Sequence, residues 1–196
     1  MQRPPMRLEP LAGGEIALGP WVRDLLETLL LALLTFLVVN ALTTRYEVLS
    51  VSMEPTLHEG QYLVVSKISY WFHEPERGDI TVFQPPNNPP GAIPLIKRVI
   101  GLPGEHVEAR DGRIWIDGAA LNEPYVGGLL NYNGSWTLGE DEYFTLGDNR
   151  NNSHDSHNWG VLPGENIIGK TVFRYWPLNK FGTFPVYAYP EVEGIP

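Results

Sequence analysis

A long apolar run stands near the start of the chain, and shorter apolar runs follow it. No ionisable residue occurs from residue 28 to residue 44, and residues 29–39 are apolar on every face of a helix. A helix that is apolar all round either spans a membrane or is deeply buried in a protein core. Together with the two leucines before it, the run reaches about the 20 residues that a bilayer requires. We therefore predict a transmembrane helix at residues 24–44.

The charges on either side of this run predict its orientation. More arginines precede the run than follow it closely: Arg3, Arg7 and Arg23 against Arg45. Cytoplasmic flanks of membrane helices are enriched in Lys and Arg. We therefore expect residues 1–23 to be cytoplasmic and residues 45–196 to face the outside of the cell or a lumen.

A cleaved signal peptide is the alternative interpretation of the same run. The sequence Val-Asn-Ala at positions 39–41 has the small residues that a cleavage site requires. The preceding segment is long, however, and its apolar core exceeds the roughly 7–15 residues that are usual in a signal peptide. This length favours a retained helix.

After the predicted helix, the pattern changes to short β-rich runs separated by Gly and Pro. Six such runs occur, at residues 62–65, 79–83, 95–100, 113–117, 143–146 and 170–175. The 20 glycines and 18 prolines of the chain leave little room for long helices. We therefore predict a mainly β fold, with one antiparallel β-rich domain over residues 45–196.

Turn signals separate these runs. Asp111-Gly112 stands between two β-rich runs and predicts a tight hairpin turn, where positive φ is needed. The proline-rich stretch at residues 84–91 predicts an exposed loop. The stretch from Gly127 to Gly139 predicts a second loop or insertion.

The composition excludes several functional classes. The chain of 196 residues carries 14 Lys and Arg against 23 Asp and Glu, a formal net charge of -9, and it has no basic run. Because phosphate binding needs clustered Lys and Arg, nucleic acid is not an expected partner. The absence of cysteine excludes disulfides, thiol nucleophiles and cysteine-type zinc sites. Any nucleophile is therefore an oxygen or is supplied by a metal.

A densely polar stretch from Gly147 to His157 is the first candidate for chemistry. His154, Asp155 and His157 are metal-ligand types. In an extended chain, however, residues three apart point to opposite faces, and the Gly, Asp and Asn content disfavours a helix. A network of turns capped by its own side chains fits this stretch better. We predict no metal and no cofactor.

A Ser-His-Asp triad is possible in composition, because the chain has five histidines. No Gly-x-Ser-x-Gly elbow occurs, however, and no strand-turn-helix context surrounds any serine. A Ser-Lys pair is the remaining option. It requires a lysine whose pKa is lowered by burial from about 10.4 to about 7–8.

Lys97 is the lysine that best meets this requirement, because it lies in the apolar run at residues 94–100. The other lysines lie beside polar or turn residues: Lys67, Lys170 and Lys180. Side chains of a strand alternate between its two faces, so Lys97 and Arg98 point to opposite faces, each among apolar neighbours. This alternation does not tell which of the two cations is buried. Only lysine can give up its proton at an accessible pH. This difference favours Lys97 as a general base.

Three separated segments resemble the ordered sequence boxes of type I signal peptidases. They are SVSMEPTL at residues 50–57, RGDI at 77–80 with KRVIGLPG at 97–104, and GDNRNNSHDS at 147–156. The resemblance runs from the apolar helix to about Pro177, and its last part is similar to the cyanobacterial and thylakoidal branch of that family. It implies an antiparallel β-sheet catalytic domain of signal-peptidase type after one N-terminal transmembrane helix.

The resemblance assigns roles to the first two boxes. Ser52, directly before Met53, matches the nucleophile, and Lys97 matches the general base. Ser50 matches the serine whose hydroxyl forms the oxyanion hole together with the backbone N–H of Ser52. The two serines of the SVSMEPTL stretch are thus expected to act on the same carbonyl group.

The third box is implied to support the lysine. Ser153 matches the hydroxyl that orients the lysine ammonium group, and Asp155 matches a carboxylate at that end of the site. Many bacterial members carry arginine after the Asp-Ser pair, where this chain has His157, as the cyanobacterial branch does. Whether His157 takes over the salt bridge that arginine would give Asp155 is left open by the sequence.

The resemblance also implies the substrate and the location. The substrates are signal peptides of exported preproteins, bound as extended segments and cut after small residues, with alanine preferred at the first and third positions before the cut. Five residues are expected to wall the shallow pockets for these side chains: Val48, Leu49, Leu57, Leu95 and Ile96. The implied location is the plasma (inner) or thylakoid membrane, with the catalytic domain on the periplasmic or lumenal side.

The aromatic stretch Tyr70-Trp71-Phe72 follows soon after the first box. It has two interpretations: insertion into the interface of the lipid membrane, or packing in a buried hydrophobic cluster. Membrane lipid is therefore an expected partner through the predicted helix and, on the first interpretation, through this stretch as well.

Two other functions remain as alternatives. One is a self-cleaving relative with the same dyad, which the predicted transmembrane helix disfavours. The other is a tethered β-rich binding domain that has lost its active site. The presence of all five matching polar residues argues against this second alternative: Ser50, Ser52, Lys97, Ser153 and Asp155.

Overall fold

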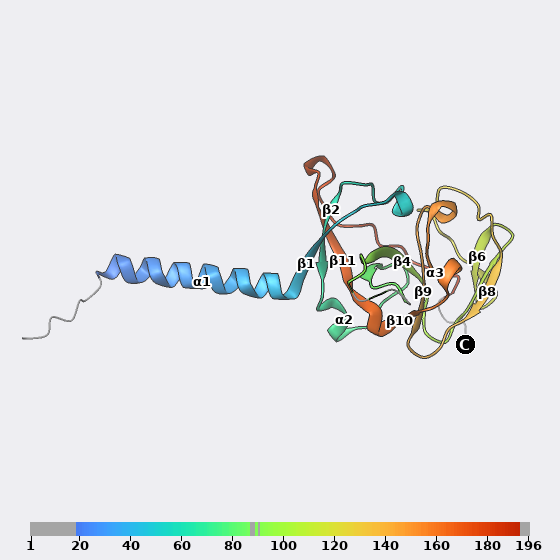
Figure 1. The fold of residues 1–196 in the computed structure, drawn as a ribbon, viewed down its shortest axis with the longest axis horizontal. Helices are drawn as coiled ribbons and strands as arrows, with labels where there is room; N and C mark the ends of the chain where they lie inside the picture. Colours follow the sequence, from blue (N-terminus) through green and yellow to red (C-terminus); the bar gives the residue numbers. More distant parts are fainter. Residues whose placement is uncertain (1–18, 87–88, 90, 193–196) are drawn as a thin grey trace, which may run out of the picture. The chain divides into compact units, whose positions relative to one another are not determined.

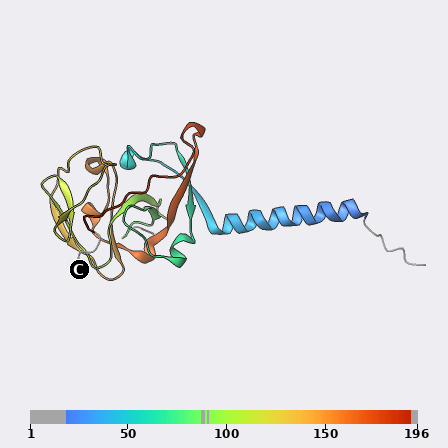
Figure 2. The ribbon, with the colours of Figure 1, turned by 180° about the vertical axis from the view of Figure 1, so that it is seen from behind.

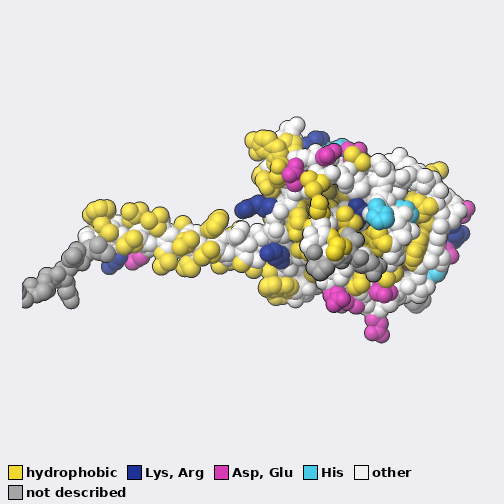
Figure 3. All heavy atoms as spheres, in the orientation of Figure 1, with side chains coloured by type: hydrophobic (Ala, Val, Ile, Leu, Met, Phe, Trp, Pro, Cys, Tyr) yellow, Lys and Arg dark blue, Asp and Glu magenta, His cyan; other side chains and the backbone are white. Residues whose placement is uncertain are grey.

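The computed structural model describes residues 19–86, 89 and 91–192, and the chain divides into two units, residues 1–39 and 40–196. Most of helix α1 (Pro20–Leu42), drawn in blue in Figures 1 and 2, belongs to the first unit. None of the helix residues is buried, and hydrophobic side chains cover the face seen in Figure 3. By length and composition, this helix is able to cross a membrane.

Helix α1 differs by a few residues from the predicted span of 24–44. It begins at Pro20, whose fixed φ and missing N–H suit the first turn of a helix. It ends at Leu42, and the next residues form strand β1 (Thr43–Glu47). This strand begins with two threonines, whose β-branched side chains favour a strand over a helix. The predicted cytoplasmic segment, residues 1–23, lies mostly outside the described residues.

The second unit contains two antiparallel sheets. The larger sheet has the strand order β1-β2-β11-β3-β4-β9-β10. Its strands after β1 are β2 (Tyr62–Ser66), β3 (Ile80–Phe83), β4 (Leu95–Gly101), β9 (Glu142–Leu146), β10 (Leu162–Pro163) and β11 (Ile167–Trp176). Five of the six predicted β-rich runs lie in this sheet, which confirms the mainly antiparallel β fold. Part of the predicted loop at residues 84–91 lies outside the described residues.

The smaller sheet has the strand order β7-β6-β5-β8. Its strands are β5 (His106–Arg110), β6 (Arg113–Ile116), β7 (Ala119–Ala120) and β8 (Gly134–Thr137). Asp111 and Gly112 between β5 and β6 have φ values of 53° and 75°, which confirms the predicted hairpin turn. The prediction of a loop at residues 127–139 is partly wrong, because β8 lies within it. This segment lacks an apolar alternation, but it pairs with β5, and Trp136 packs on Phe144 with ring centroids 4.6 Å apart.

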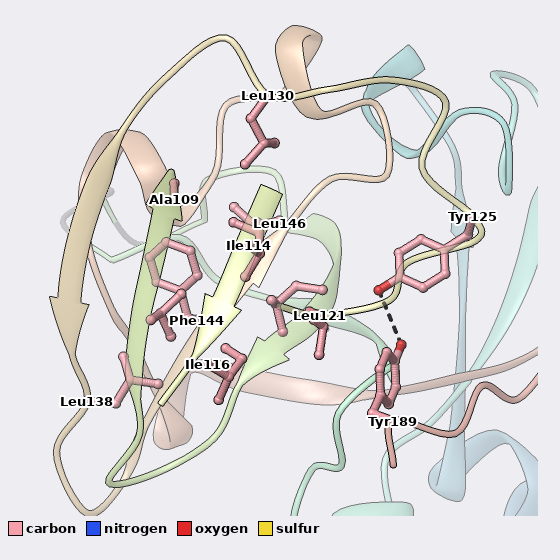
Figure 4. Close-up of a cluster of buried hydrophobic side chains, with 12 residues drawn as sticks. Ala109, Ile114, Ile116, Leu121, Tyr125, Leu130, Leu138, Phe144, Leu146 and Tyr189 are labelled. Atoms are coloured by element: carbon pink, nitrogen blue, oxygen red, sulfur yellow. Dashed lines mark hydrogen bonds between the residues drawn. The ribbon is translucent and has the colours of Figure 1, made fainter. Parts of the chain in front are cut away.

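Among the described residues of the second unit, three buried hydrophobic clusters hold the fold together. The largest joins the two sheets and includes side chains of β4, β5, β6 and β9 (Figure 4). A second cluster contains Val48, Met53, Leu57, Leu63 and Ile80. The third contains Phe83, Val99, Tyr143 and Leu162. Burial of each such side chain contributes about 1.5–3 kcal/mol. Strand β4 contributes to all three clusters, and this places its side chains at fixed positions inside the domain.

Candidate active site

A short 3-10 turn, η1 (Val51–Met53), carries Ser52. Ser50 precedes the turn in an extended conformation. Met53 is 1% exposed and packs in the second hydrophobic cluster with Leu57, whose N–H donates to the Met53 carbonyl at 2.9 Å. The buried side chain of Met53 thus anchors the turn to this hydrophobic cluster. Ser52, directly before it, is held at the edge of this cluster and is itself only 7% exposed.

Lys97 on β4 lies beside Ser52. Its Nζ is 2.6 Å from Ser52 Oγ, and the lysine is 3% exposed. Burial lowers the pKa of Lys97 to about 8, an effect that the nearby carboxylates of Asp155 and Asp148 oppose. At pH 7 about a tenth of Lys97 is therefore neutral and able to accept a proton, as a general base requires, against fewer than about one molecule in a thousand for an ordinary lysine.

Ser50 is the second hydroxyl at this site. Its Oγ lies 3.2 Å from Ser52 Oγ, and the residue is exposed. The structure therefore brings together three of the predicted site residues, Ser50, Ser52 and Lys97, from two elements that are far apart in the sequence.

Asn149 fixes the turn η1 through two hydrogen bonds to its backbone. Its backbone N–H donates to the carbonyl of Ser52 at 3.0 Å, and its side-chain Nδ2 donates to the carbonyl of Val51 at 3.0 Å. Two bonds from one residue hold η1 at both of these peptide units. The sequence comparison with signal peptidases included Asn149 in a matching box but gave it no role, because a side chain that binds backbone leaves no chemical signature.

Gly147 allows the third box to approach the turn closely. A Cβ atom at this position would overlap the Ser153 hydroxyl and the Ser52 carbonyl oxygen. The Ser153 hydroxyl is buried and, among the described residues, has no hydrogen-bond partner. Ser153 thus lies close to the turn, but its predicted hydrogen bond to Lys97 is not formed here, and this role stays a prediction.

Asp155 is completely buried and uses both of its oxygens. Oδ2 accepts from the backbone N–H of Gly147 at 2.9 Å, and Oδ1 lies 2.6 Å from His157 Nδ1. Asp155 also caps helix α3 (Ser156–Trp159) by accepting from the backbone N–H of His157 at 3.3 Å. His157 stacks on Tyr132 with ring centroids 4.0 Å apart. The histidine therefore occupies the partner position where many bacterial signal peptidases have arginine.

These contacts show no arrangement for a metal ion. No group of three His, Cys, Asp or Glu side chains suited to hold a metal occurs within the described part of the chain. The stretch from Gly147 to His157 is instead a network of turns and a capped helix, because the Asp155 carboxylate binds backbone N–H groups and an imidazole. This agrees with the interpretation of the stretch as a turn network.

Arg98 corrects the expectation that one cation of the pair at positions 97 and 98 is buried and the other extends to solvent. Arg98 is 2% exposed, and it binds Asp148 through two hydrogen bonds of 2.9 and 2.7 Å. It also donates to the carbonyl of Gly78 at 2.8 Å, and its guanidinium carbon lies 4.0 Å from the ring centroid of Tyr125. The strand is covered on both faces, so both cations are buried.

The five residues expected to wall substrate pockets lie in different surroundings. Val48 and Leu57 are buried in the cluster beneath η1, and Ile96 packs against that cluster. Leu95 packs against the third cluster, whereas Leu49 is 58% exposed. Three of the five therefore belong to or pack against one cluster with Met53, and two of these, Val48 and Leu57, are buried in this conformation.

The aromatic stretch at residues 70–72 forms helix α2 (Ser69–Phe72), and its residues separate into two groups. The Tyr70 hydroxyl donates to Asp79 at 3.0 Å, and Asp79 also pairs with Lys170 at 2.6 Å. Trp71 and Phe72 are 71% and 78% exposed. These two side chains therefore do not belong to a buried cluster, so the second interpretation of the stretch is wrong for them.

The comparisons with known proteins agree with this geometry. Residues 21–176 match the family model described as signal peptidase, peptidase S26. Signal peptidase I of Leptolyngbya laminosa is 49% identical over 68% of this chain and 68% of its own length. Probable signal peptidase I-1 of Synechocystis is 41% identical over 90% of this chain and 95% of its own length. Thylakoidal processing peptidase 1 of Arabidopsis thaliana is 40% identical over 72% of this chain and 44% of its own length. The chain therefore belongs to the signal peptidase family, peptidase S26, in the cyanobacterial and thylakoidal branch of the type I serine endopeptidases.

Proposed function

We propose that this protein is a membrane-anchored endopeptidase that removes signal peptides from exported preproteins, with Ser52 as nucleophile and Lys97 as general base. The observation that carries the proposal is the 2.6 Å approach of Lys97 Nζ to Ser52 Oγ in a buried setting. Among the described residues, Lys97 forms no ion pair that would keep it charged. A buried amine without a counter-ion, next to a hydroxyl, has the properties of a base for that hydroxyl.

The proposed reaction has two stages. In the first, neutral Lys97 removes the hydroxyl proton of Ser52 while Oγ attacks the carbonyl carbon of the scissile peptide bond. The Ser52 N–H and the Ser50 hydroxyl donate to the resulting oxyanion. When the intermediate collapses, the Lys97 ammonium gives its proton to the leaving amine, and an ester to Ser52 remains. In the second stage, Lys97 removes a proton from water as the water oxygen attacks the ester carbonyl. When this second intermediate collapses, the bond to Ser52 Oγ breaks, the Lys97 ammonium returns the proton to Oγ, and the signal peptide leaves with a new carboxylate.

Ser153 and Asp155 contribute to this reaction by positioning Lys97 and the turn that carries Ser52. The Ser153 hydroxyl, buried and without a partner in the part of the chain that the structure describes, is suited to accept a hydrogen bond from the Lys97 ammonium group once the lysine has taken up a proton. Asp155 holds the N–H of Gly147, and Gly147 packs against the backbone of Ser52. These contacts keep the lysine amine and the serine hydroxyl in one geometry through both stages.

The predicted preference for substrates with small side chains is attributed to the apolar residues around Ser52. Val48, Leu49, Leu95 and Ile96 would wall shallow pockets, and Leu57 would support them from below. An extended substrate with alanine at the first and third positions before the cut fits such pockets, whereas a longer side chain collides with their walls. A preprotein with Leu in place of either alanine should be cleaved at least about tenfold more slowly. Equal cleavage of the Leu and Ala forms would contradict this part of the proposal.

Incubation of the purified protein with a preprotein tests the dyad. Ser52→Ala and Lys97→Ala should each abolish cleavage, because one removes the nucleophile and the other removes its base. Ser135→Ala and Lys67→Met change an exposed serine and an exposed lysine, and they should cleave as the parent does. Excess chelator should leave the parent active. Cleavage at the parental rate by either dyad variant would contradict the proposal.

Membrane attachment is proposed through helix α1, with the segment before it cytoplasmic, the membrane span ending at Leu42 and the catalytic domain from β1 onward on the periplasmic or lumenal side. Support comes from the length and apolar composition of the helix and from the arginines that precede it. A nucleophile ten residues beyond the helix would meet the cleavage site of a preprotein where it leaves the bilayer. Protease digestion of sealed vesicles of known orientation checks this arrangement, since digestion from the cytoplasmic side should spare the catalytic domain.

Trp71 and Phe72 are proposed as a second membrane contact. Both are more than two-thirds exposed and adjacent in the chain, and exposed apolar side chains that lie together mark a contact with a membrane or a partner. A fragment of residues 43–196 should bind liposomes, and the double change Trp71→Ser and Phe72→Ser should weaken this binding. Unchanged binding by the double variant would contradict the insertion.

A further inference from the structure

The chain continues beyond the part that matches the family model. That match ends at residue 176, the last residue of β11, and the 3-10 turn η4 (Leu178–Lys180) follows. Residues 182–192, here called the strap, then run in dark red across the domain in Figure 2. The strap begins with Gly182, which forms two backbone hydrogen bonds with Arg174 of β11, of 2.9 and 3.0 Å.

The first part of the strap touches the segment that carries Ser52. Phe184 packs against the cluster that contains Met53 and Leu57. Arg174, which lies 5.7 Å from the Phe184 ring, donates to the carbonyl of Thr56 at 3.3 Å. The strap and the end of β11 therefore cover the side of the SVSMEPTL segment that follows the nucleophile.

The middle of the strap encloses the buried Arg98. The Tyr187 ring lies 5.0 Å from the Tyr125 ring between centroids, and Arg98 lies over both rings, 4.0 Å from Tyr125 and 5.6 Å from Tyr187. The Tyr189 hydroxyl donates to the Tyr125 hydroxyl at 3.2 Å, the dashed bond in Figure 4. Aromatic faces stabilise a guanidinium group and exclude water from it. Two strap tyrosines thus complete the pocket of Arg98.

Tyr189 also packs directly on a residue of the family motif. Gly78 has φ of 93°, and a Cβ atom there would come within 2.9 Å of the Tyr189 hydroxyl. The Gly78 carbonyl accepts a hydrogen bond from Arg98 at 2.8 Å. Tyr189 therefore fixes Arg98 in two ways, through Tyr125 and through the backbone of Gly78.

Arg98 in turn connects the strap to the nucleophile. Arg98 holds Asp148 through two hydrogen bonds, of 2.9 and 2.7 Å. The next residue, Asn149, donates to the carbonyl groups of Val51 and Ser52, each at 3.0 Å. A movement of Arg98 therefore reaches the backbone of Ser52 through only two neighbouring residues.

We propose that Tyr187 and Tyr189 are positioning residues: they hold Arg98 and Asp148, and through Asn149 they fix the 3-10 turn that carries the nucleophile. The proposal rests on the proposed function of Ser52. It extends the active site to a segment outside the region that the family model matches, and it assigns that segment a role in the reaction.

Two single variants of the full-length protein test the proposal. Tyr189→Ala and Tyr187→Leu open the pocket of Arg98 while leaving all dyad residues in place. Each should lower kcat for preprotein cleavage by roughly tenfold to a hundredfold with KM changed little, because a displaced nucleophile loses orientation. Tyr189→Phe keeps the ring on Gly78 and should recover most of the loss. Val186→Ser is the matched control, since Val186 is 97% exposed, and its kcat should equal that of the parent.

The pH profile separates positioning from a loss of folded protein. Asp155 and Asp148 are the carboxylates that raise the pKa of Lys97. Water in the Arg98 pocket weakens the pairing of Arg98 with Asp148, which leaves more of the Asp148 charge to act on Lys97 and so raises the pKa of the lysine. In Tyr189→Ala and Tyr187→Leu the rise of kcat with pH should therefore move to higher pH. A smaller amount of folded enzyme would lower the curve without moving it.

Hydrogen exchange gives a readout that does not depend on the proposed reaction. The amide of Asn149 should exchange faster in Tyr189→Ala and Tyr187→Leu than in the parent and in Val186→Ser. Failure of the proposed function would appear instead as cleavage by Ser52→Ala with normal exchange in that variant. Parental kcat, pH profile and Asn149 exchange in both strap variants would overturn the positioning role.

Discussion

Lys97 and Arg98 are neighbours on β4, both are buried, and their surroundings differ completely. Arg98 has the Asp148 carboxylate, the Gly78 carbonyl and the face of Tyr125. Lys97 has the hydroxyl of Ser52 at 2.6 Å and, within the described residues, no ion pair. Its carboxylate neighbours, Asp155 and Asp148, act on it only from a distance, and Asp155 is occupied by backbone and histidine contacts.

This difference shows how one strand supports both structure and chemistry. A buried cation with a paired carboxylate remains charged and fixes its partners in place. A buried cation without one loses much of its affinity for a proton, which makes the amine a base near neutral pH. Lys97 and Arg98 lie on opposite faces of β4. The presence or absence of a paired carboxylate on each face determines whether the cation there stays charged or readily loses its proton.

Replacement of Lys97 tests one side of the comparison and should have the largest effect. Lys97→Met should lower kcat/KM by at least about a thousandfold, because the serine loses its base. The free energy of unfolding should stay the same or rise by roughly 1–3 kcal/mol at pH 7, since an uncompensated buried charge is removed. Preprotein cleavage and chemical denaturation measure the two quantities. Loss of stability together with activity would mean that Lys97 is structural.

Replacement of Arg98 tests the other side. Arg98→Met leaves Asp148 buried without its partner and should lower the free energy of unfolding by roughly 3–5 kcal/mol. The double variant Arg98→Met with Asp148→Leu removes both charges and should recover much of this loss. Denaturant unfolding of the parent, the single and the double variant measures the coupling. A single variant as stable as the parent would contradict the structural role of the pair.

The pH dependence of the parent enzyme sharpens the comparison. Burial lowers the pKa of Lys97 to about 8, and the base is active only when neutral. The value of kcat/KM should therefore fall by about tenfold per pH unit below this pKa and level off above it. A series of preprotein cleavage rates between about pH 6 and pH 9.5 determines the midpoint. A midpoint near the ordinary lysine value would show that burial does not tune this residue.

The partner of Asp155 should give the smallest effect. His157 binds the Asp155 carboxylate at 2.6 Å and stacks on Tyr132. Arginine can also bind a carboxylate and stack on a ring, so His157→Arg should keep kcat within about threefold of the parent. His157→Leu leaves the buried carboxylate with fewer partners and should cost about 1–3 kcal/mol of stability. Equal stability of the parent and His157→Leu would show that Asp155 does not need this partner.

The sequence predicted those parts of the molecule whose signals are local. The apolar helix, five strands of the larger sheet and the hairpin at Asp111-Gly112 follow from periodicity, length and turn chemistry. Strand β8 was missed, because its four residues have no alternation and become a strand only by pairing with β5 and packing on Phe144.

The candidate site was predictable where residue chemistry limits the choice. The chain has no cysteine and few lysines, and Lys97 lies in an apolar run whereas the other lysines lie beside polar or turn residues, so the pairing of Ser52 and Lys97 could be proposed. The partners of Arg98 could not, because Asp148 is 50 residues away in the sequence and Tyr187 lies outside the family match. Such pairings depend on the sheet order, which no local pattern encodes.

The lysine base can be tested most directly by restoring it chemically. Because the chain has no cysteine, Lys97→Cys introduces the only thiol, and alkylation with 2-bromoethylamine rebuilds a lysine-like amine at this position alone. The unmodified variant should be inactive, and preprotein cleavage should return once mass spectrometry shows complete alkylation. Alkylation with iodoacetamide, which adds no amine, should restore nothing. Cleavage by the unmodified variant, or no recovery in the fully alkylated protein, would contradict the central claim that the amine of residue 97 activates Ser52.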